Sequence, residues 1–207
     1  MSAPPGGRNL VSCGLFVLML VAGGSHGLAS DEKKPIVSDK PLSAEQLAIY
    51  RAVLKRFLSD DSGGLNLSIQ TVPVETEGPF AGHDCVKGLD MEPVQPNIVH
   101  AFKNDDLSRL GVSSLRLVDP DQQGKEVKKN DPGKTIRKGV SVDDAVKNGF
   151  AHALFSLSEI SFDKKHEHAI VSYSFWCGSL CGNGGSLVLV RKGEKWSFQT
   201  QCGGWIS

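Results

Sequence analysis

The sequence carries no excess of either charge. Its 207 residues include 23 Lys and Arg against 23 Asp and Glu, so the formal net charge at pH 7 is zero. A neutral chain gains no long-range attraction to nucleic acid or to an anionic membrane surface, because that attraction grows with net charge. The composition therefore speaks against a nucleic-acid partner.

Long hydrophobic runs are also lacking. The longest, from Leu10 to Ala22, is shorter than the roughly 18 residues expected of a membrane-spanning helix. It follows Arg8 and precedes a series of small residues, an arrangement typical of a secretory signal peptide. We expect residues 1–29 to be this signal, cleaved after Ala29, and no stable membrane span after cleavage. An uncleaved signal would act as an anchor. The sequence thus predicts an exported protein, periplasmic or extracellular.

Cysteine is scarce. Five are present, and Cys13 falls within the predicted signal peptide. The other four form an even number, and an even number of cysteines in an oxidising compartment favours disulfide bonds. These four are Cys85, Cys177, Cys181 and Cys202. They allow three pairings, and their spacing alone does not choose among the pairings.

Residues 42–207 have the pattern of a single α+β domain behind a flexible leader at residues 30–41. The leader is charged and nearly free of large apolar groups. Ser43 and Gln46 form a capping box for an amphipathic N-terminal helix. The C-terminal part is rich in β-branched and aromatic residues. We expect the helix to pack on an antiparallel β-sheet that ends in a four-strand meander, with strands at 150–162, 168–177, 186–192 and 195–201.

Residues 119–140 mix both signs of charge with proline and glycine, so we predict an exposed loop. The stretch from Asp119 to Gly124 resembles the first half of a calcium-binding loop. Asn130 stands where the twelfth position needs a glutamate, and nearby lysines oppose a cation. We therefore do not expect calcium there.

The stretch SFWCGSLCGNGGSLVLV, residues 174–190, places Cys177 and Cys181 four positions apart between two apolar runs. Asn183-Gly184-Gly185 can supply the positive backbone dihedrals of a tight turn, so we predict a hairpin with its tip there. The cysteines suggest a redox pair, a metal site or a disulfide. The thioredoxin motif has two residues between its cysteines and lies at a strand-to-helix junction, which speaks against the redox interpretation.

A zinc site would add His166 and His168 to Cys177 and Cys181, which makes the four ligands of a tetrahedral site. Exported cysteines are more often oxidised, and a His-x-His pair in a charged turn is usually solvated. We therefore favour a disulfide that closes the short loop, with a second bond between Cys85 and Cys202. The sequence predicts no cofactor.

The candidates for catalysis are few. His83 and Cys85 lie two residues apart, so on an extended chain they could form a nucleophile and its base. A disulfide at Cys85 would abolish that pair, and we predict no catalytic residue. Motifs for serine hydrolases, zinc proteases, P-loop proteins and dinucleotide binding are absent from the sequence. The sequence also contains three tryptophans, Trp176, Trp196 and Trp205. They could line a pocket, but we favour packing in the core and at the sheet edge.

Several segments share a pattern with a known group of proteins. They are residues 97–104, 157–163, 169–174, 177–184, 195–196 and 205–207. Together they resemble a family of uncharacterised exported bacterial proteins. The most specific part is a Cys-Gly-x-x-Cys-Gly-x-Gly hairpin followed by a terminal Trp-x-Ser. The resemblance implies export and an α+β domain, and it implies no catalytic residue. Cys85 and Cys202 lie outside the pattern, which favours pairing of Cys177 with Cys181.

These observations lead to three functional hypotheses. The leading one is a secreted or periplasmic binding or interaction module of unknown ligand. The first alternative is a hydrolase of envelope or extracellular material that uses the His83/Cys85 pair or the zinc site. The second alternative is a structural envelope protein.

Overall fold

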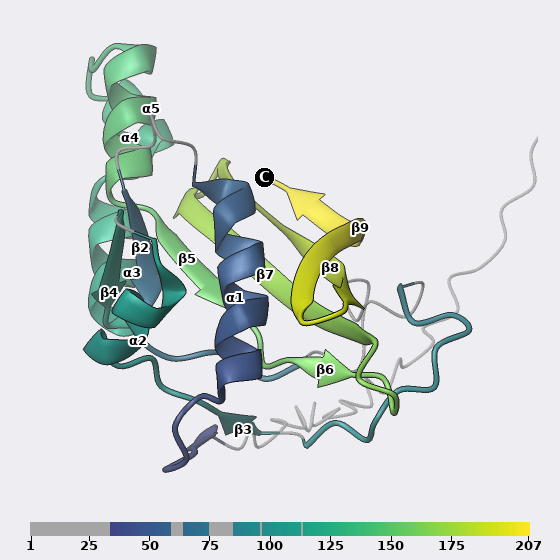
Figure 1. The fold of residues 1–207 in the computed structure, drawn as a ribbon. Coiled ribbons are helices and arrows are strands. Elements are labelled where there is room, and N and C mark those ends of the chain that lie inside the picture. The colour runs from purple at the N-terminus through teal and green to yellow at the C-terminus, as the bar shows by residue number, and fades with distance from the viewer. Residues whose placement is uncertain (1–33, 59–63, 75–84, 96, 113) are drawn as a thin grey trace, which may run out of the picture. The chain divides into compact units, whose positions relative to one another are not determined.

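The structure is a computed structural model, and it describes residues 34–58, 64–74, 85–95, 97–112 and 114–207. The first part of the chain contains all the described helices together with short strands, and the last part is all strand (Figure 1). In chain order the elements are β1 (Ile36–Val37), α1 (Ala44–Phe57), β2 (Leu65–Ser68), β3 (Ile98–Val99), α2 (Asn104–Leu110), β4 (Leu115–Val118), α3 (Pro120–Lys129), α4 (Pro132–Ile136), α5 (Val142–Ala151), β5 (Leu154–Leu157), β6 (Ser161–Phe162), β7 (His168–Gly178), β8 (Cys181–Lys192) and β9 (Lys195–Ile206).

The main sheet has the strand order β4-β2-β5-β7-β8-β9, with β6 paired to β7 beside this path. Strands β5, β7, β8 and β9 pair antiparallel, while β2 runs parallel to both β4 and β5. The predicted fold class is therefore confirmed: an N-terminal helix packs on a mostly antiparallel sheet that ends in a meander. The two parallel pairings are an addition that the sequence did not predict.

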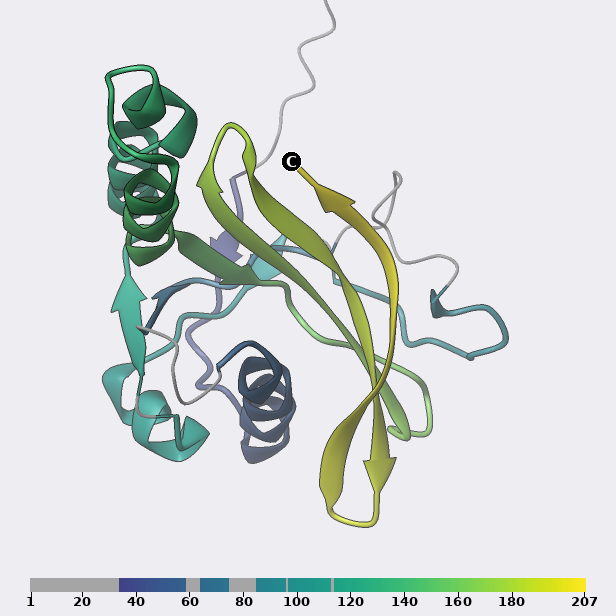
Figure 2. The same ribbon diagram turned by 90° about the horizontal axis from the view of Figure 1, so that it is seen from above.

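Helix α1 covers one face of the sheet (Figure 2). The predicted capping box is present: the Ser43 hydroxyl accepts from Gln46 N at 3.1 Å, and the Gln46 side chain accepts from Ser43 N at 2.9 Å. The buried side of the helix packs on apolar residues that alternate along β5, β7 and β8, as strand geometry requires. The core is formed by Leu47, Ile49, Tyr50, Val53 and Leu54 of α1 with Phe155, Leu157, Ala169, Val171, Tyr173, Leu187 and Leu189 of the sheet.

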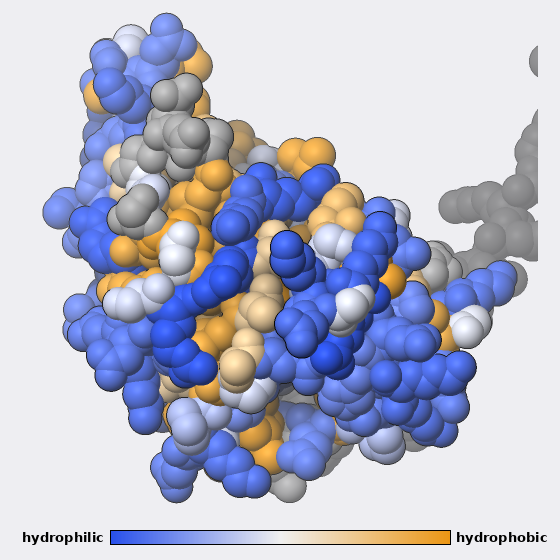
Figure 3. All heavy atoms as spheres, viewed as in Figure 1, coloured by the Kyte–Doolittle hydropathy of each residue, from blue (hydrophilic) through white to orange (hydrophobic). Residues whose placement is uncertain are grey.

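Hydrophilic residues dominate the face that carries α1, and apolar side chains show there mainly as a band beside the helix (Figure 3). No helix in the described ranges is both long and apolar enough to cross a membrane.

Residues 119–140 are not the predicted loop. They form α3 and α4, and each helix begins at an aspartate followed by proline. Asp119 accepts from Gln122 N at 2.8 Å, and Asp131 accepts from Lys134 N at 3.3 Å. An aspartate N-cap with proline at the first helical position is a strong helix start, because the carboxylate satisfies a free N–H and proline lacks one. The calcium-like stretch is thus a helix start.

The hairpin tip also differs from the prediction. Gly178 pairs with Cys181, so the turn between β7 and β8 consists of Ser179 and Leu180. Asn183-Gly184-Gly185 lies within β8 instead. Gly178 has a φ of 148°, and a Cβ there would lie 2.9 Å from Cδ of Pro132. Glycine is needed at residue 178 both for the backbone conformation and for the close approach of α4.

The predicted leader differs in part. Residues 30–33 lie outside the described residues, but β1 belongs to the leader and pairs parallel with β3. Ile36 N donates to Asn97 O at 2.7 Å, and Ser38 N donates to Val99 O at 2.8 Å. The segment before α1 is therefore fastened to the domain by backbone hydrogen bonds.

Candidate functional site

Five serines lie on one face of the sheet, where β5, β7 and β8 run side by side. Successive side chains of a strand point to opposite faces, and the core residues of β7 point toward α1. Ser172 and Ser174 therefore point away from α1. The strand register places Ser156 beside Ser174 and Ser186 beside Ser172, and Ser158 follows directly after β5. We refer to these five residues as the serine face.

The five hydroxyls are not equally engaged. Oγ of Ser172 lies 2.8 Å from Oγ of Ser186. The Ser158 hydroxyl accepts from Ser172 N at 2.8 Å and donates to the Glu159 carbonyl at 2.7 Å. For Ser156 and Ser174, no side-chain hydrogen bond to any other described residue is present. These two hydroxyls therefore remain available to a ligand.

A groove of about 310 Å³ lies over the serine face. This volume is at the lower end of the range of known small-molecule sites, which is about 300–1,000 Å³. Apolar surface comes from Val72, Pro73 and Trp205, and no described Asp, Glu, Lys or Arg lines it. We name it the serine groove, and its lining is Val72, Pro73, Ser156, Ser158, Ser172, Tyr173, Ser174, Gly185, Ser186 and Trp205.

Two glycines of β8 seat the indole of Trp205 at this groove. The register pairs Trp205 with Gly184. A Cβ on Gly184 would lie 2.8 Å from Cε2 of the indole, and a Cβ on Gly182 would lie 3.0 Å from Cη2 and from Cζ3. Carbon atoms in favourable contact are about 3.5–4.0 Å apart. The indole therefore rests on the strand at a spacing that only glycine permits.

Two sequence motifs that are far apart in the chain meet at this point. Residues 177–184 carry the cysteine-glycine motif, and residues 205–207 carry the terminal Trp-x-Ser. Asn183 pairs with Ile206, and Ser207 N donates to Gly182 O at 3.0 Å. Segments that are separate in the sequence thus form one structural unit at the end of the serine groove.

The structure contains two disulfides, between Cys177 and Cys181 and between Cys85 and Cys202. The Cα atoms are 5.0 Å apart in the first pair and 5.6 Å apart in the second. The first bond closes the β7–β8 turn. The second fastens the segment around residue 85 to β9, and Cys202 pairs with Ser186 of the serine face. A cysteine in a disulfide has no thiolate, so in this form none of the four can act as a nucleophile or a metal ligand.

A buried carboxylate holds the same turn from outside the sheet. Asp131 is only 3% exposed, and it accepts from Ser179 N at 3.0 Å. Burial alone would raise the pKa of the Asp131 carboxyl, but hydrogen bonds from Ser179, Lys134 and Gly133 outweigh it and lower the pKa below its ordinary value. The ionised carboxylate thereby ties the hairpin to the start of α4.

The four residues of the hypothetical zinc site do not come together. Nδ1 of His168 lies 3.1 Å from the Asp163 carboxylate, and the ring nitrogens of His166 face Glu92 at 3.2 Å and Glu45 at 3.4 Å. His168 begins β7 and Cys177 stands near its end, so the strand separates them by about 30 Å at roughly 3.3 Å per residue. No group of three or more His, Cys, Asp or Glu among the described residues could hold a metal ion.

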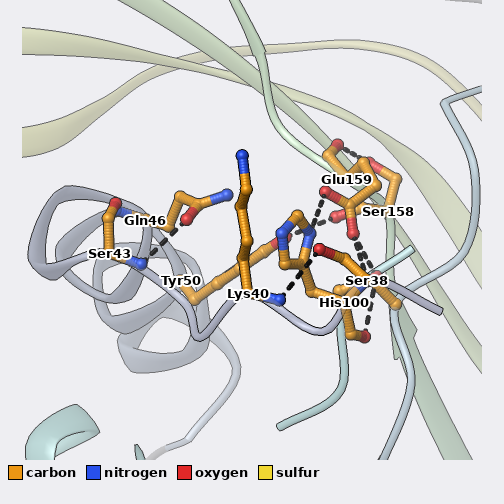
Figure 4. Close-up of polar contacts among 9 residues, drawn as sticks. Ser38, Lys40, Ser43, Gln46, Tyr50, His100, Ser158 and Glu159 are labelled. Atoms are coloured by element: carbon orange, nitrogen blue, oxygen red, sulfur yellow. Dashed lines mark hydrogen bonds and ion pairs between the residues drawn. The ribbon is translucent and has the colours of Figure 1, made fainter. Parts of the chain in front are cut away.

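A second polar cluster lies at the edge of α1, where Glu159 receives three hydrogen bonds. Its carboxylate accepts from His100 N at 2.7 Å and from the Thr71 hydroxyl, and it lies 2.9 Å from Nδ1 of His100. Figure 4 shows the carboxylate directed at the imidazole. Beside it, the Tyr50 hydroxyl donates to Ser158 O at 3.0 Å. Burial first, and then the charge of Glu159, raise the pKa of Tyr50 well above its ordinary value.

The same cluster contains the residue types of a hydrolytic triad without its contacts. Ser38 follows Val37, which pairs with Val99, so it stands beside His100. The Ser38 hydroxyl accepts from Lys40 N at 3.2 Å, and no hydrogen bond between it and the imidazole is present among the described residues. A triad needs that contact to activate the serine. The cluster therefore joins three chain segments, and it presents no assembled nucleophile.

The remaining predicted residues fall in different places. His83 lies outside the described residues, and its partner Cys85 is in the second disulfide. Trp196 is buried in the core, as favoured. Trp176 packs against α3, where a Cβ on Gly124 would lie 3.5 Å from its Cζ3. Of the three tryptophans, Trp205 lines the groove.

Comparisons with known proteins gave no match. No family model, curated protein or solved structure matches the chain. The groove therefore has to be interpreted from its own chemistry.

Sequence reasoning did not find the serine groove, although a signal was present. Ser172 and Ser174 alternate with Val171, Tyr173 and Phe175, which already indicates a polar face opposite an apolar one. What the sequence did not provide was the register. Without it, nothing aligns the serines of β5 and β8 with those of β7.

Proposed function

We propose that this chain is an exported binding module and that the serine groove is its ligand site. The groove itself carries the proposal: it combines two available hydroxyls, an indole in a fixed position and no charged side chain among its described lining residues. Ligand sites are typically concave and largely preformed, with apolar surface and a few placed polar groups. The groove fits that description.

Two further observations support the proposal. Disulfides persist mainly in oxidising compartments, which favours a periplasmic or extracellular location. Two of the segments that resemble the exported bacterial family, residues 177–184 and 205–207, also lie at the end of the groove, and we keep membership of that family as part of the proposal.

The indole N–H signals of the three tryptophans offer a direct test. The protein is labelled with ¹⁵N, the Trp205 signal is assigned with Trp205→Phe, and spectra are recorded with cellotriose, a blocked Pro-Pro-Gly tripeptide or uridine. We expect at least one compound to shift the Trp205 signal. Ser174→Phe, which places a ring in the groove, should abolish that shift.

The buried Trp196 serves as the folding control, because its signal should be the same in the wild type and in Ser174→Phe. If none of the three compounds moves the Trp205 signal, the groove is not a binding site for small neutral molecules and the proposal is wrong. The proposal is also wrong if Ser174→Phe is folded and binds unchanged.

A further inference from the structure

We infer that the ligand of the serine groove is a neutral saccharide whose ring stacks on Trp205. This inference rests on the proposed function and adds the chemical class of the ligand. Three properties of the groove lead to it: the absence of charged side chains from its described lining, the kind of polar group that remains available, and the position of the indole.

The absence of charge argues against ionic ligands. The described lining contains neither an acidic nor a basic side chain. A phosphate, carboxylate or ammonium group that enters such a groove loses hydration and gains no counter-charge, which is costly. The groove thus favours a ligand without formal charge.

The available polar groups are hydroxyls. Ser156 and Ser174 stand side by side on β5 and β7. Each hydroxyl has one donor and two acceptor positions and can rotate to suit its partner. A pair of such groups is well matched to neighbouring hydroxyls of a sugar, which also donate and accept.

The indole supplies the complementary apolar surface. Trp205 rests on the glycines of β8 and is partly exposed. Tryptophan gives a large rigid apolar surface at a low cost in conformational entropy. A pyranose ring carries its C–H groups on a face and its hydroxyls around the rim. Stacking of that face on Trp205 would direct rim hydroxyls toward the serines.

A peptide fits the groove less well. Peptides that add to a sheet bind along an exposed edge, where backbone N–H and C=O groups are free. The serine groove lies on the face of β5, β7 and β8, whose neighbouring strands are paired on both sides. A peptide backbone would therefore find only serine hydroxyls there.

Calorimetric titration with cellotriose, maltotriose and chitotriose tests the inference, with trigalacturonate and the blocked Pro-Pro-Gly tripeptide for comparison. We expect at least one neutral saccharide to bind and trigalacturonate to bind more weakly. Trp205→Ala should weaken saccharide binding about tenfold or more, because it removes the stacking surface. Ser174→Ala should weaken it about three- to tenfold, which corresponds to the loss of one neutral hydrogen bond.

Two variants act as controls. Trp205→Phe keeps an aromatic ring and should retain most of the affinity, whereas Trp176→Phe changes a tryptophan outside the groove lining and should have no effect. If the peptide or uridine shifts the Trp205 signal and no saccharide binds, the ligand class is wrong while the binding function stands. If no compound shifts that signal, both fall. Saccharide binding that persists unchanged in Trp205→Ala also overturns the inference.

Discussion

Trp205 and Gly184 lie on neighbouring strands in direct register, and the indole occupies the space where a side chain on residue 184 would begin. The position of the tryptophan therefore depends on a missing Cβ. This relationship links two motifs of the sequence, since the glycine belongs to the Cys-Gly-x-x-Cys-Gly-x-Gly motif and the tryptophan to the Trp-x-Ser motif. It also places an aromatic surface at the serine groove.

Gly184→Ala should displace the indole. The added Cβ would lie 2.8 Å from both Cε2 of Trp205 and the backbone oxygen of Tyr173, so the strand or the ring must move. We expect a loss of about 1–3 kcal/mol in the free energy of unfolding, as for other overpacked sites. Chemical denaturation measures this loss.

Gly124→Ala is the matched control for this experiment. A Cβ there would make an ordinary contact with Trp176, and residue 124 lies within α3. Alanine is a better helix former than glycine by about 1 kcal/mol, so the variant should be neutral or stabilising. If Gly184→Ala and Gly124→Ala changed the free energy of unfolding equally, the indole would not rest on Gly184 as described.

The glycines also show why the hairpin was predicted at the wrong place. Asn183-Gly184-Gly185 is a typical turn sequence because glycine readily adopts positive φ. In the structure, Gly184 and Gly185 have no positive φ. Their lack of a Cβ matters instead, because both face close neighbours. Sequence alone does not distinguish a glycine chosen for its backbone from one chosen for its size.

Helices α3 and α4 were missed for a different reason. The prediction relied on apolar periodicity, and α3 has a single buried residue, Val127. The capping signals were present, because Asp119-Pro120 and Asp131-Pro132 both have the form of a helix start. By contrast, the capping box of Ser43 and the apolar stripe of α1 agreed with each other, and that helix was predicted correctly.

The two disulfides should differ in their contribution to stability. Cys85 and Cys202 are 117 positions apart in the sequence, whereas Cys177 and Cys181 are four apart. A cross-link that closes a longer loop removes more conformational entropy from the unfolded chain. We expect the double variant Cys85→Ala/Cys202→Ala to lose about 3–5 kcal/mol and Cys177→Ala/Cys181→Ala about 2 kcal/mol.

Guanidinium denaturation of the two double variants checks this order. Alanine is used in both because Cys177 is buried and a serine there would add a buried hydroxyl. A larger loss for the Cys177/Cys181 variant would contradict the entropic argument and would indicate that the turn is held mainly by its bond.

Glu159→Gln should destabilise the cluster that joins the segments after β2, β3 and β5. The carboxylate accepts from Thr71 and from both the backbone and the ring of His100, and an amide has only one accepting oxygen. We expect a loss of about 1–3 kcal/mol in the free energy of unfolding. Glu92→Gln removes a more exposed partner of a histidine, His166, and should cost about 1 kcal/mol or less. If the two variants lost similar amounts of unfolding free energy, the hydrogen bonds of Glu159 would stabilise the fold no more than a surface ion pair does.

Asp163 should make the stability of the protein depend on acid pH. Its carboxylate accepts from Glu167 N at 2.8 Å and from His168 N at 2.9 Å, beside Nδ1 of His168. Burial alone would raise the pKa of Asp163, but the hydrogen bonds from His168 and Glu167 and the nearby charge of His168 lower it below its ordinary value. An aspartate with a depressed pKa stabilises the fold at pH values above its unfolded pKa, which is about 4. That stabilisation is lost as the pH falls through the lower, folded value.

Asp163→Asn should therefore unfold more easily than the wild type at pH 7, and the difference between the two should shrink as the pH falls below about 4, the unfolded pKa of aspartate. Urea denaturation across this range measures both effects. Asp131, whose pKa is also lowered, is still present in the variant. The dependence of the free energy of unfolding on acid pH should therefore become weaker in the variant without disappearing. Asp39→Asn, at an exposed position before α1, serves as the control and should follow the wild type. A constant difference between Asp163→Asn and the wild type at every pH would mean that the carboxyl stabilises the turn equally well when it is protonated, and the role given to its charge would be wrong.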